Sequence, residues 1–411
     1  MGRVVLGVTG GIAAYKACEV LRRLREAGHD VTVVPTPNAL EFVGAVTWAA
    51  LSGRPVATDV FTDADRIPHV RLGREAELVV VAPATADLLA RAAAGRADDL
   101  LTNVLLTATC PVLVCPAMHT EMWHHPATRA NVATLRSRGV VVLDPGVGRL
   151  AGADEGQGRL PAPPDIVEVA ALLLESPDAV TSARAQDLTG LRVAVSAGGT
   201  REPVDPVRYV GNASSGRMGV AIAKAAALRG AEVTLVAAHV DGELSAGSIA
   251  VRRVATTADL AAAMHDVAAD HDVLIMAAAP ADFTPVTASE RKIKKESSSS
   301  GLTLELAQTV DVLASLVRAR RDGQTIVGFA AETIPDLTAL LEAGRAKLAR
   351  KGCDLLVVND VSAGKVFGSD ATSAHIIAAH GLVSSVTGSK TLAAHRILDA
   401  VATWRHQPER G

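Results

Sequence analysis

Short apolar runs rich in β-branched residues alternate along the chain with amphipathic stretches. The first run, residues 3–9, ends at Gly10-Gly11, and an amphipathic stretch over 12–27 and a second apolar run over 31–34 follow. The order of strand, glycine turn, helix and strand is typical of a βαβ unit with parallel strands. The pattern then predicts strands at 78–82, 112–115 and 140–143 and helices at 85–94, 127–137 and 165–175.

The pattern stops over residues 176–190, which have no sustained apolar period, and then restarts. A predicted strand at 191–196 leads into the turn Gly198-Gly199. We therefore predict an α/β fold of two doubly wound domains, residues 1–178 and 191–411, joined by a linker at 179–190. Further strands of the second domain are predicted at 233–236, 273–277, 326–329 and 355–358, and helices at 218–228, 337–349 and 392–404.

The composition is that of a globular protein with large cores. The chain has 411 residues, 49% of them hydrophobic and only 2% aromatic, so aliphatic residues must build the cores. A net charge of −3 argues against a disordered chain and against a broadly basic nucleic-acid-binding one. No apolar run reaches the ~18 residues that span a bilayer. The four cysteines are too sparse for a disulfide scaffold and lack zinc-ligand spacing. We predict a soluble, cytoplasmic protein with no membrane or nucleic-acid partner.

Glycine follows the first predicted strand of each domain, at the sheet edge where helix N-termini can bind anions. Neither turn matches the G-x-G-x-x-G fingerprint, and the glycines could simply permit a tight turn. Residues 211–216 have the glycine spacing of a phosphate-binding P-loop, but Arg217 and Met218 stand where that loop needs Lys and Ser or Thr. This argues against a P-loop NTPase, but the segment is still compatible with a polar nest that binds a ligand.

Several lysines and one histidine are further candidate functional residues. The cationic run at 291–295 is by default a solvated surface, but it follows the predicted strand end at 277–282, where ligands bind in such folds. Lys347 and Lys351 are one helical turn apart, so both ammonium groups can lie on one face and suit a triphosphate. His69, one of twelve histidines, lies shortly before a predicted buried strand, a place that permits a site role.

The N-terminal half resembles the flavin-dependent cysteine decarboxylases. Five motifs carry the resemblance: residues 10–16, His69, residues 82–87, residues 116–123 with Pro-Ala-Met and Met-Trp, and residues 156–159. The resemblance implies a flavodoxin-like domain that binds FMN.

Five motifs of the C-terminal half carry a second resemblance: residues 198–209, 212–219, 292–295, 328–333 and 358–361. With them this half resembles the phosphopantothenate–cysteine ligases, which implies a Rossmann-like ligase domain. In this order the two halves resemble the bifunctional enzymes of coenzyme A biosynthesis, and the match covers nearly the whole chain.

Two consecutive reactions are implied by this resemblance. The ligase half would activate 4′-phosphopantothenate with CTP, giving an acyl-cytidylate and pyrophosphate, and cysteine's amine would then form the amide. The decarboxylase half would use FMN to oxidise the cysteinyl thiol, release carbon dioxide and reduce the resulting enethiol to 4′-phosphopantetheine. The triphosphate would bring Mg2+, whose protein ligands stay unassigned.

The resemblance also implies roles for single residues of the decarboxylase. His69 would be the catalytic base or orienting group at the thiol, as suits a side chain that titrates near neutrality. Substrate would be held by Met118, His119, Met122 and Arg159. FMN would be held by Gly10, Gly11, Ile12, Thr36, Pro83, Ala84 and Thr85, with Phe42 as a further candidate.

In the ligase, Asn212 would stabilise the acyl-cytidylate and Lys292 would promote its conversion. Val310 stands where related ligases have proline. The residues implied to bind CTP are Asp282, Lys292, Val310, Asp311, Val312, Leu313, Phe329, Lys347 and Lys351.

Two positions of the decarboxylase half depart from the family pattern. His119 stands where the family has asparagine, and Gly152 stands where a flap cysteine takes part in the reduction. Either another proton donor replaces that cysteine or the flap alignment is shifted. Cys115 is a candidate substitute, although a small buried hydrophobe is the more common role of such a residue.

Alternative functions are an oxidative cysteine decarboxylase that releases an enethiol, a non-catalytic regulatory flavoprotein, and a generic nucleotide-binding oxidoreductase. Fusion to a ligase that makes the decarboxylase's substrate argues against the first, and retention of His69, Asn212 and Lys292 argues against the second. The resemblance further implies a homo-oligomer with trimeric decarboxylase and dimeric ligase contacts, combining into an assembly as large as a dodecamer.

Overall fold

The computed structural model describes residues 2–58, 67–150, 154–176, 186–241, 249–294, 301–360 and 371–407. They form two compact units that divide at Leu188. The predicted α/β class with two doubly wound sheets is confirmed. Of the predicted linker, residues 179–185 lie outside the described part. Within the described ranges, every helix is too short or too polar to cross a lipid bilayer.

The first unit is built on a five-stranded parallel sheet with the order β2-β1-β3-β4-β5. This is the flavodoxin-like order, in which ligands bind where the strand order reverses, here between β1 and β3. An antiparallel hairpin, β6–β7, follows the sheet. The strands are β1 Arg3–Val8, β2 Asp30–Pro35, β3 Leu78–Ala84, β4 Val112–Pro116, β5 Val141–Val142, β6 Gly146–Arg149 and β7 Glu155–Arg159.

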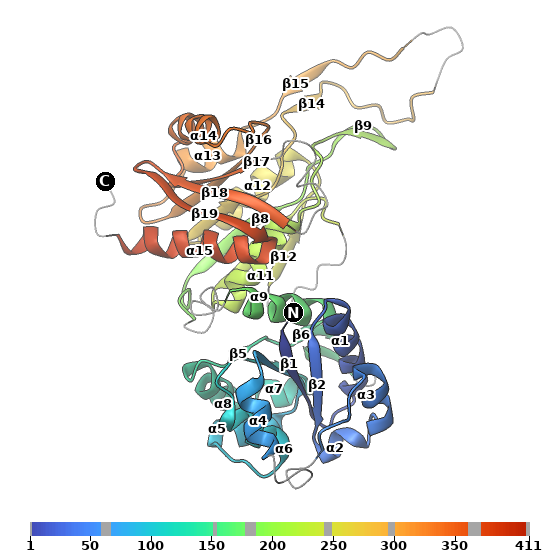
Figure 1. Cartoon of the computed structure of the whole chain (residues 1–411). Helices are drawn as coiled ribbons and strands as arrows, with labels where there is room; N and C mark the ends of the chain where they lie inside the picture. Colours follow the sequence, from blue (N-terminus) through green and yellow to red (C-terminus); the bar gives the residue numbers. More distant parts are fainter. Residues whose placement is uncertain are drawn as a thin grey trace. The chain divides into compact units, whose positions relative to one another are not determined.

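Helices cover both faces of this sheet (Figure 1). Helix α1 buries Ala14, Ala17, Val20, Leu21 and Leu24, the helical spacing of one apolar face, and packs with α3 and α9. Helices α5, α6 and α8 pack on the other face. The helices are α1 Ala14–Glu26, α2 Pro37–Leu40, α3 Ala45–Ser52, α4 Pro68–Glu75, α5 Ala86–Ala94, α6 Leu100–Thr107, α7 Thr120–His124, α8 Pro126–Ser137 and α9 Pro163–Glu175.

The second unit contains an eight-stranded sheet, β12-β11-β8-β13-β16-β17-β18-β19. Counted in chain order, its six parallel strands follow the Rossmann order 3-2-1-4-5-6, and β18 and β19 extend the sheet antiparallel. The strands are β8 Arg192–Ala197, β9 Glu202–Asp205, β10 Arg208–Val210, β11 Glu232–Ala237, β12 Ala250–Arg253, β13 Val273–Met276, β14 Phe283–Pro285, β15 Leu306–Gln308, β16 Thr325–Glu332, β17 Leu355–Asp360, β18 Ala371–Ala378 and β19 Gly381–Ser389.

The helices of this unit also lie in two layers. Helices α11 and α15 pack on one face of the sheet and α12, α13 and α14 on the other (Figure 1). Two hairpins, β9–β10 and β14–β15, stand apart from the sheet and follow the carboxyl ends of β8 and β13. The helices are α11 Arg217–Leu228, α12 Thr257–Ala268, α13 Val312–Arg318, α14 Leu337–Lys351 and α15 Lys390–His406.

Candidate functional sites

Thr9 joins the two strands at the point where the order of the first sheet reverses. Its buried hydroxyl donates to the Pro83 carbonyl at 2.8 Å and accepts from the Thr85 backbone N–H at 3.0 Å. The carboxyl ends of β1 and β3 are therefore held side by side at the flavin edge predicted from the sequence. Sequence reasoning did not single out Thr9, because its partners lie more than seventy positions away in the chain.

The glycine turn after β1 fits a phosphate group. A Cβ on Gly10 would lie 2.4 Å from the Cβ of Asn38, so only glycine permits this close approach. In the described structure no acceptor pairs the backbone N–H groups of Gly11 and Ile12, and α1 begins without a side-chain cap. Unpaired N–H groups at a helix N-terminus bind anions. The turn thus presents unpaired N–H donors where the flavin phosphate is predicted.

We expect Gly10→Ala to lower the affinity for FMN about tenfold or more. Overpacking costs about 1–3 kcal/mol, and about 1.4 kcal/mol changes a binding constant tenfold. Titration of the flavin-free protein with FMN, followed by visible absorbance, measures the effect. Gly44→Ala is the matched control, because a Cβ there meets nothing within 4 Å. Equal affinities in the two variants would contradict the packing argument.

The other predicted flavin residues surround this turn with different exposure. Thr36 is buried at the end of β2 and precedes α2, and Phe42 is exposed shortly after that helix. Pro83 and Ala84 are buried within β3. Thr85 is half-buried and caps α5 through its hydroxyl. Phe42, Thr85 and the glycine turn are therefore the parts of this set that the surface exposes.

The end of β4 is crossed by the β6–β7 hairpin. The Met118 N–H donates to the Gly158 carbonyl at 3.0 Å, and a Cβ on Gly158 would lie 2.1 Å from the Met118 carbonyl oxygen. A Cβ on Gly156 would similarly lie 2.3 Å from the Thr120 hydroxyl. The two glycines let the hairpin lie against the segment that carries the predicted substrate residues. Of these, Met122 is 48% exposed on α7.

His119 lies between two carboxylates. Its Nδ1 is 2.5 Å from Oε2 of Glu121, and its Nε2 is 3.2 Å from Oδ2 of Asp154, which precedes β7. The hydrogen bond to Glu121, followed by the charges of Glu121 and Asp154, raises the pKa of His119 above its ordinary value. An imidazole with a carboxylate at each nitrogen is stabilised as the cation. The two carboxylates therefore favour the protonated ring at the position where the resemblance implies an asparagine.

Arg159, at the end of β7, is close to Lys16 in the first turn of α1. Burial and, next, the Arg159 guanidinium lower the pKa of Lys16. Two cations near one another favour an anionic ligand such as a phosphate or carboxylate. Lys16 was not among the predicted site residues, although it belongs to the motif at residues 10–16.

His69 lies in the first turn of α4. Its carbonyl accepts from the Thr107 hydroxyl of α6 at 2.9 Å, and its buried Nδ1 has no hydrogen-bond partner among the described residues. That nitrogen is therefore not engaged in a hydrogen bond within the described structure. Cys115 is wholly buried in β4, and burial raises the pKa of its thiol, as for a core residue. Gly152 lies outside the described residues.

The second unit has a cavity of about 730 Å3 at the carboxyl ends of β13 and β16. It gathers all the residues predicted to bind CTP except Lys292, together with Asn212. This is the place where doubly wound sheets bind nucleotides. The predicted residues that line it are Asn212, Asp282, Val310, Asp311, Val312, Leu313, Phe329, Lys347 and Lys351.

Both lysines of the cavity are paired with carboxylates. Lys347 Nζ is 3.0 Å from Oε1 of Glu332, and Lys351 contacts Asp311, which also caps α13. Burial acts to raise the pKa of Asp311, but Lys351 and the Ala314 N–H hold it below its ordinary value. The ammonium groups are therefore held in place and charged on one wall of the cavity. Sequence analysis did not identify Glu332 as the partner of Lys347.

Two asparagines also line this cavity. The Asn212 amide donates to the Pro280 carbonyl at 2.8 Å, which fixes the loop after β10 against the end of β13. The Oδ1 atom of Asn359, at the end of β17, is buried and has no partner in the described structure. Asn359 belongs to the motif at residues 358–361 but was not predicted as a site residue. It adds an unused polar group to the cavity wall.

Lys292 does not line the cavity. It is exposed on a segment that the Ile293 N–H ties to Asp205 Oδ2, at 3.1 Å, beside the β9–β10 hairpin. The neighbouring Lys295 lies outside the described residues. The structure thus separates Lys292 from Lys347 and Lys351, which were predicted to act on the same triphosphate.

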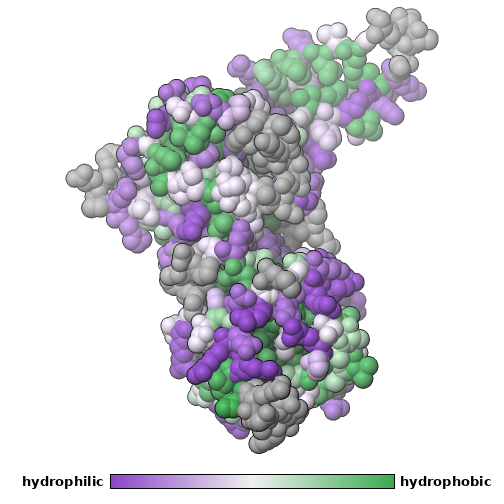
Figure 2. Space-filling view, in the orientation of Figure 1, coloured by the Kyte–Doolittle hydropathy of each residue, from purple (hydrophilic) through white to green (hydrophobic). Residues whose placement is uncertain are grey.

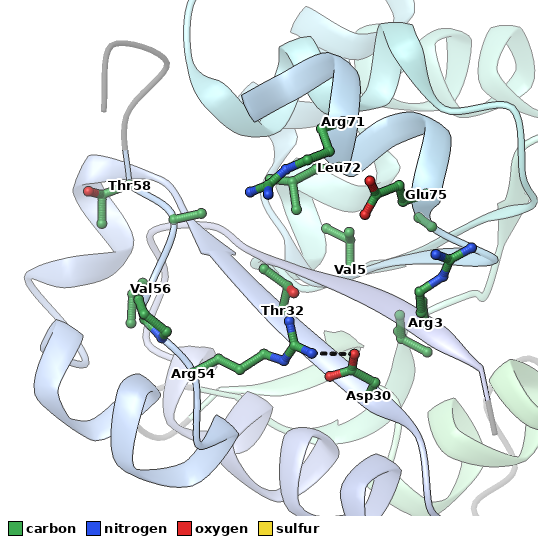
Figure 3. A pocket seen from close by; sticks show the side chains of 14 residues that line it. Arg3, Val5, Asp30, Thr32, Arg54, Val56, Thr58, Arg71, Leu72 and Glu75 are labelled. Carbon is green, nitrogen blue, oxygen red and sulfur yellow. Dashed lines mark hydrogen bonds and ion pairs between the residues drawn. The ribbon is translucent and has the colours of Figure 1, made fainter. Parts of the chain in front are cut away.

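A further cavity of about 300 Å3 lies at the amino ends of β1 and β2, opposite the glycine turn (Figure 3). Asp30 and Arg54 form an ion pair of 2.6 Å in its wall, and Arg71 and Glu75 of α4 line the other side. None of the predicted site residues lies there. Among the described residues, no group of three or more His, Cys, Asp or Glu side chains could hold a metal ion.

Comparison with known proteins gives matches over both units. The family model described as Flavoprotein matches residues 2–174, and the model of the DNA/pantothenate metabolism flavoprotein C-terminal domain matches residues 188–404.

Three relatives are similar along most of their length. The coenzyme A biosynthesis bifunctional protein CoaBC of Mycobacterium tuberculosis is 57% identical over 408 residues, which cover 98% of this chain and 96% of that protein. The protein of the same name from Mycolicibacterium smegmatis is 55% identical, covering 98% and 97%. The one from Bacillus subtilis is 42% identical, covering 89% and 88%.

Proposed function

Because the chain belongs to the family of coenzyme A biosynthesis bifunctional proteins CoaBC, we propose that it performs two reactions in the cytoplasm. The C-terminal unit joins cysteine to 4′-phosphopantothenate with CTP, and the N-terminal unit decarboxylates 4′-phosphopantothenoylcysteine with FMN. The observation that carries this proposal is the match of both units, in one order, to bifunctional relatives. It does not favour an enethiol-releasing decarboxylase or a regulatory flavoprotein.

The ligase reaction takes place in the cavity at β13 and β16. A carboxylate oxygen of 4′-phosphopantothenate attacks the α-phosphorus of CTP, and pyrophosphate leaves. Cysteine's amine then attacks the acyl carbon of the acyl-cytidylate, and CMP leaves. Lys347 and Lys351 exchange their carboxylate partners for phosphate oxygens and neutralise the charge that develops there. Mg2+ is held mainly by the triphosphate, as is usual for this ion.

Asn212 and Lys292 act on the acyl-cytidylate in this proposal. The Asn212 amide is held at the cavity by Pro280 and keeps its oxygen for a ligand. Lys292 lies outside the cavity wall in the described structure, and we propose that it promotes conversion of the acyl-cytidylate once the nucleotide is bound. The arm formed by β14, β15 and the adjoining residues exposes apolar side chains (Figure 2), which supports contact with a second copy of the chain. The exposed residues are Phe283, Val286, Leu302, Leu304 and Leu306.

In the decarboxylase reaction, the bound flavin supplies reversible oxidation at the substrate's sulfur. The glycine turn at Gly10 and Gly11 holds its phosphate through backbone N–H groups. His69 takes the thiol proton at Nδ1, which is unpartnered among the described residues. Arg159 binds an anionic group of the substrate, and Met118 and Met122 contact its apolar part. The C-terminal unit thus makes phosphopantothenoylcysteine, and the N-terminal unit consumes it.

The test is to mix the purified protein with CTP, Mg2+, cysteine and 4′-phosphopantothenate, and to follow pyrophosphate and carbon dioxide. We expect both products in equal amounts, and replacement of CTP by ATP should lower the pyrophosphate yield. Absence of pyrophosphate would refute the ligase assignment. Pyrophosphate without carbon dioxide would refute the decarboxylase assignment alone.

A further inference from the structure

His119 is an exposed histidine held between two carboxylates after β4, beside the predicted substrate residues Met118 and Met122. Its side chain is 38% exposed, so a ligand can reach the ring. Glu121, from α7, and Asp154, from the segment before β7, are the carboxylates that face it. The Ala117 N–H donates to the Ala84 carbonyl at 3.1 Å, which joins this segment to the end of β3 beside the flavin turn. The ring therefore lies at the same edge of the sheet as the turn at Gly10.

Decarboxylation at this edge of the sheet requires a proton for the substrate's Cα. The bond between the substrate's Cα and its carboxylate carbon breaks, carbon dioxide leaves, and the electron pair stays with Cα. A C–H bond must then form at Cα with one proton, and the net reaction consumes no oxidant or reductant. Cys115 cannot supply that proton from the surface, because it is wholly buried in the core.

We propose that the His119 imidazolium donates the proton that replaces the substrate's carboxylate. The inference rests on the decarboxylase activity proposed above. The proton comes from Nε2, because the Nε2 contact with Asp154 is 3.2 Å long whereas Nδ1 is held by Glu121 at 2.5 Å. The new bond joins this proton to Cα, the neutral imidazole stays hydrogen-bonded to Glu121, and solvent restores the proton at Nε2.

The carboxylates on both sides prepare His119 for this step. They raise its pKa above its ordinary value, with Glu121 as the larger cause, and so favour the protonated ring. A general acid works best when its pKa lies near the working pH, and such a group contributes about 100- to 10,000-fold to a rate. An asparagine at this position has no acidic proton to give. The histidine is thus a chemical difference of this chain and not a conservative replacement.

The first test replaces the ring with amides. We expect His119→Gln and His119→Asn to lower the formation of fully reduced 4′-phosphopantetheine about 100-fold or more, because the proton is needed after carbon dioxide has left. Flavin absorbance and pyrophosphate release should be unchanged, and added imidazole should restore part of the activity. Any product that stops at the enethiol will be two hydrogens lighter by mass spectrometry. His124 is an exposed histidine at the end of α7, and His124→Gln is the matched control, with full activity expected.

The outcomes separate the inference from the proposed function. If the two amide variants form reduced product at a rate within about threefold of the parent protein, the role of His119 is overturned. A loss that imidazole does not restore and that accompanies flavin loss would also overturn it, because it would show a structural role. If the parent protein itself releases pyrophosphate but no carbon dioxide, the decarboxylase assignment fails instead.

The second test measures the proton directly. The activity should fall as pH rises through the pKa of His119, which lies above the ordinary value of about 6.5. The same titration is followed by the ring's NMR signals in the flavin-bound protein. Glu121→Gln should move both midpoints to lower pH, and further than Asp154→Asn does, since Glu121 is the larger cause of the shift. An activity midpoint that stays fixed while the NMR midpoint moves would refute proton donation by His119.

Discussion

Gly158→Ala is expected to lower the rate of carbon dioxide release about 100-fold or more while the ligase reaction continues. The added Cβ would lie 2.1 Å from the Met118 carbonyl oxygen, and the Met118 N–H is bonded to the Gly158 carbonyl at 3.0 Å. Neither backbone can give way without breaking this pair. The hairpin and the substrate segment must therefore separate, and a displacement of about 1 Å can cost 100-fold in rate.

The measurement uses both activities of one chain. Carbon dioxide is followed with phosphopantothenoylcysteine as the substrate, and pyrophosphate is followed with the ligase substrates, so a global folding defect would reduce both. Gly146→Ala lies on the same hairpin, and its Cβ would meet the nearest atom, the Arg159 carbonyl oxygen, at an ordinary 3.8 Å. If Gly158→Ala behaved like Gly146→Ala, the close contact would not be needed for decarboxylation.

Lys347→Ala is expected to lower kcat/KM for CTP about 10- to 100-fold. The variant loses a charge-assisted hydrogen bond, which contributes about 1.5–3 kcal/mol. It also leaves Glu332 without its cation. Initial rates of pyrophosphate release at varied CTP concentration measure the change.

Two further variants test the reason for this effect. Arg350→Ala removes a cation from the same helix outside the cavity, so kcat/KM for CTP should be unchanged. Glu332→Gln removes the competing carboxylate but keeps Lys347, so its loss should be much smaller than that of Lys347→Ala. A Lys347→Ala variant with normal CTP kinetics would remove this lysine from the nucleotide site.

Regular burial made most of the two sheets predictable. β1, α1 and β2 lie within two residues of the predicted bounds, because buried parallel strands are continuous apolar runs and α1 has one apolar face. The β6–β7 hairpin was missed because its glycine-rich, polar sequence has no apolar period. β18 and β19 were missed as well, although they extend the second sheet with antiparallel pairs.

The candidate nucleotide site followed partly from local spacing. Lys347 and Lys351 were expected on one helix face, and both line the cavity. Their partners Glu332 and Asp311 were not predictable, since they come from other segments of the chain. Lys292 was grouped with these lysines because its cationic run follows a predicted strand end and belongs to a ligase motif, whereas the structure places it on a segment tied to the β9–β10 hairpin.

By itself, then, the sequence determined the α/β class, the order of the two units and the glycine turn at Gly10, because each depends on local periodicity or on a motif of neighbouring residues. Only the tertiary structure decided which charges meet. It placed His119 between Glu121 and Asp154, and Arg159 near Lys16. Contacts between segments distant in the chain depend on how the strands and helices pack, and no local pattern reports that packing.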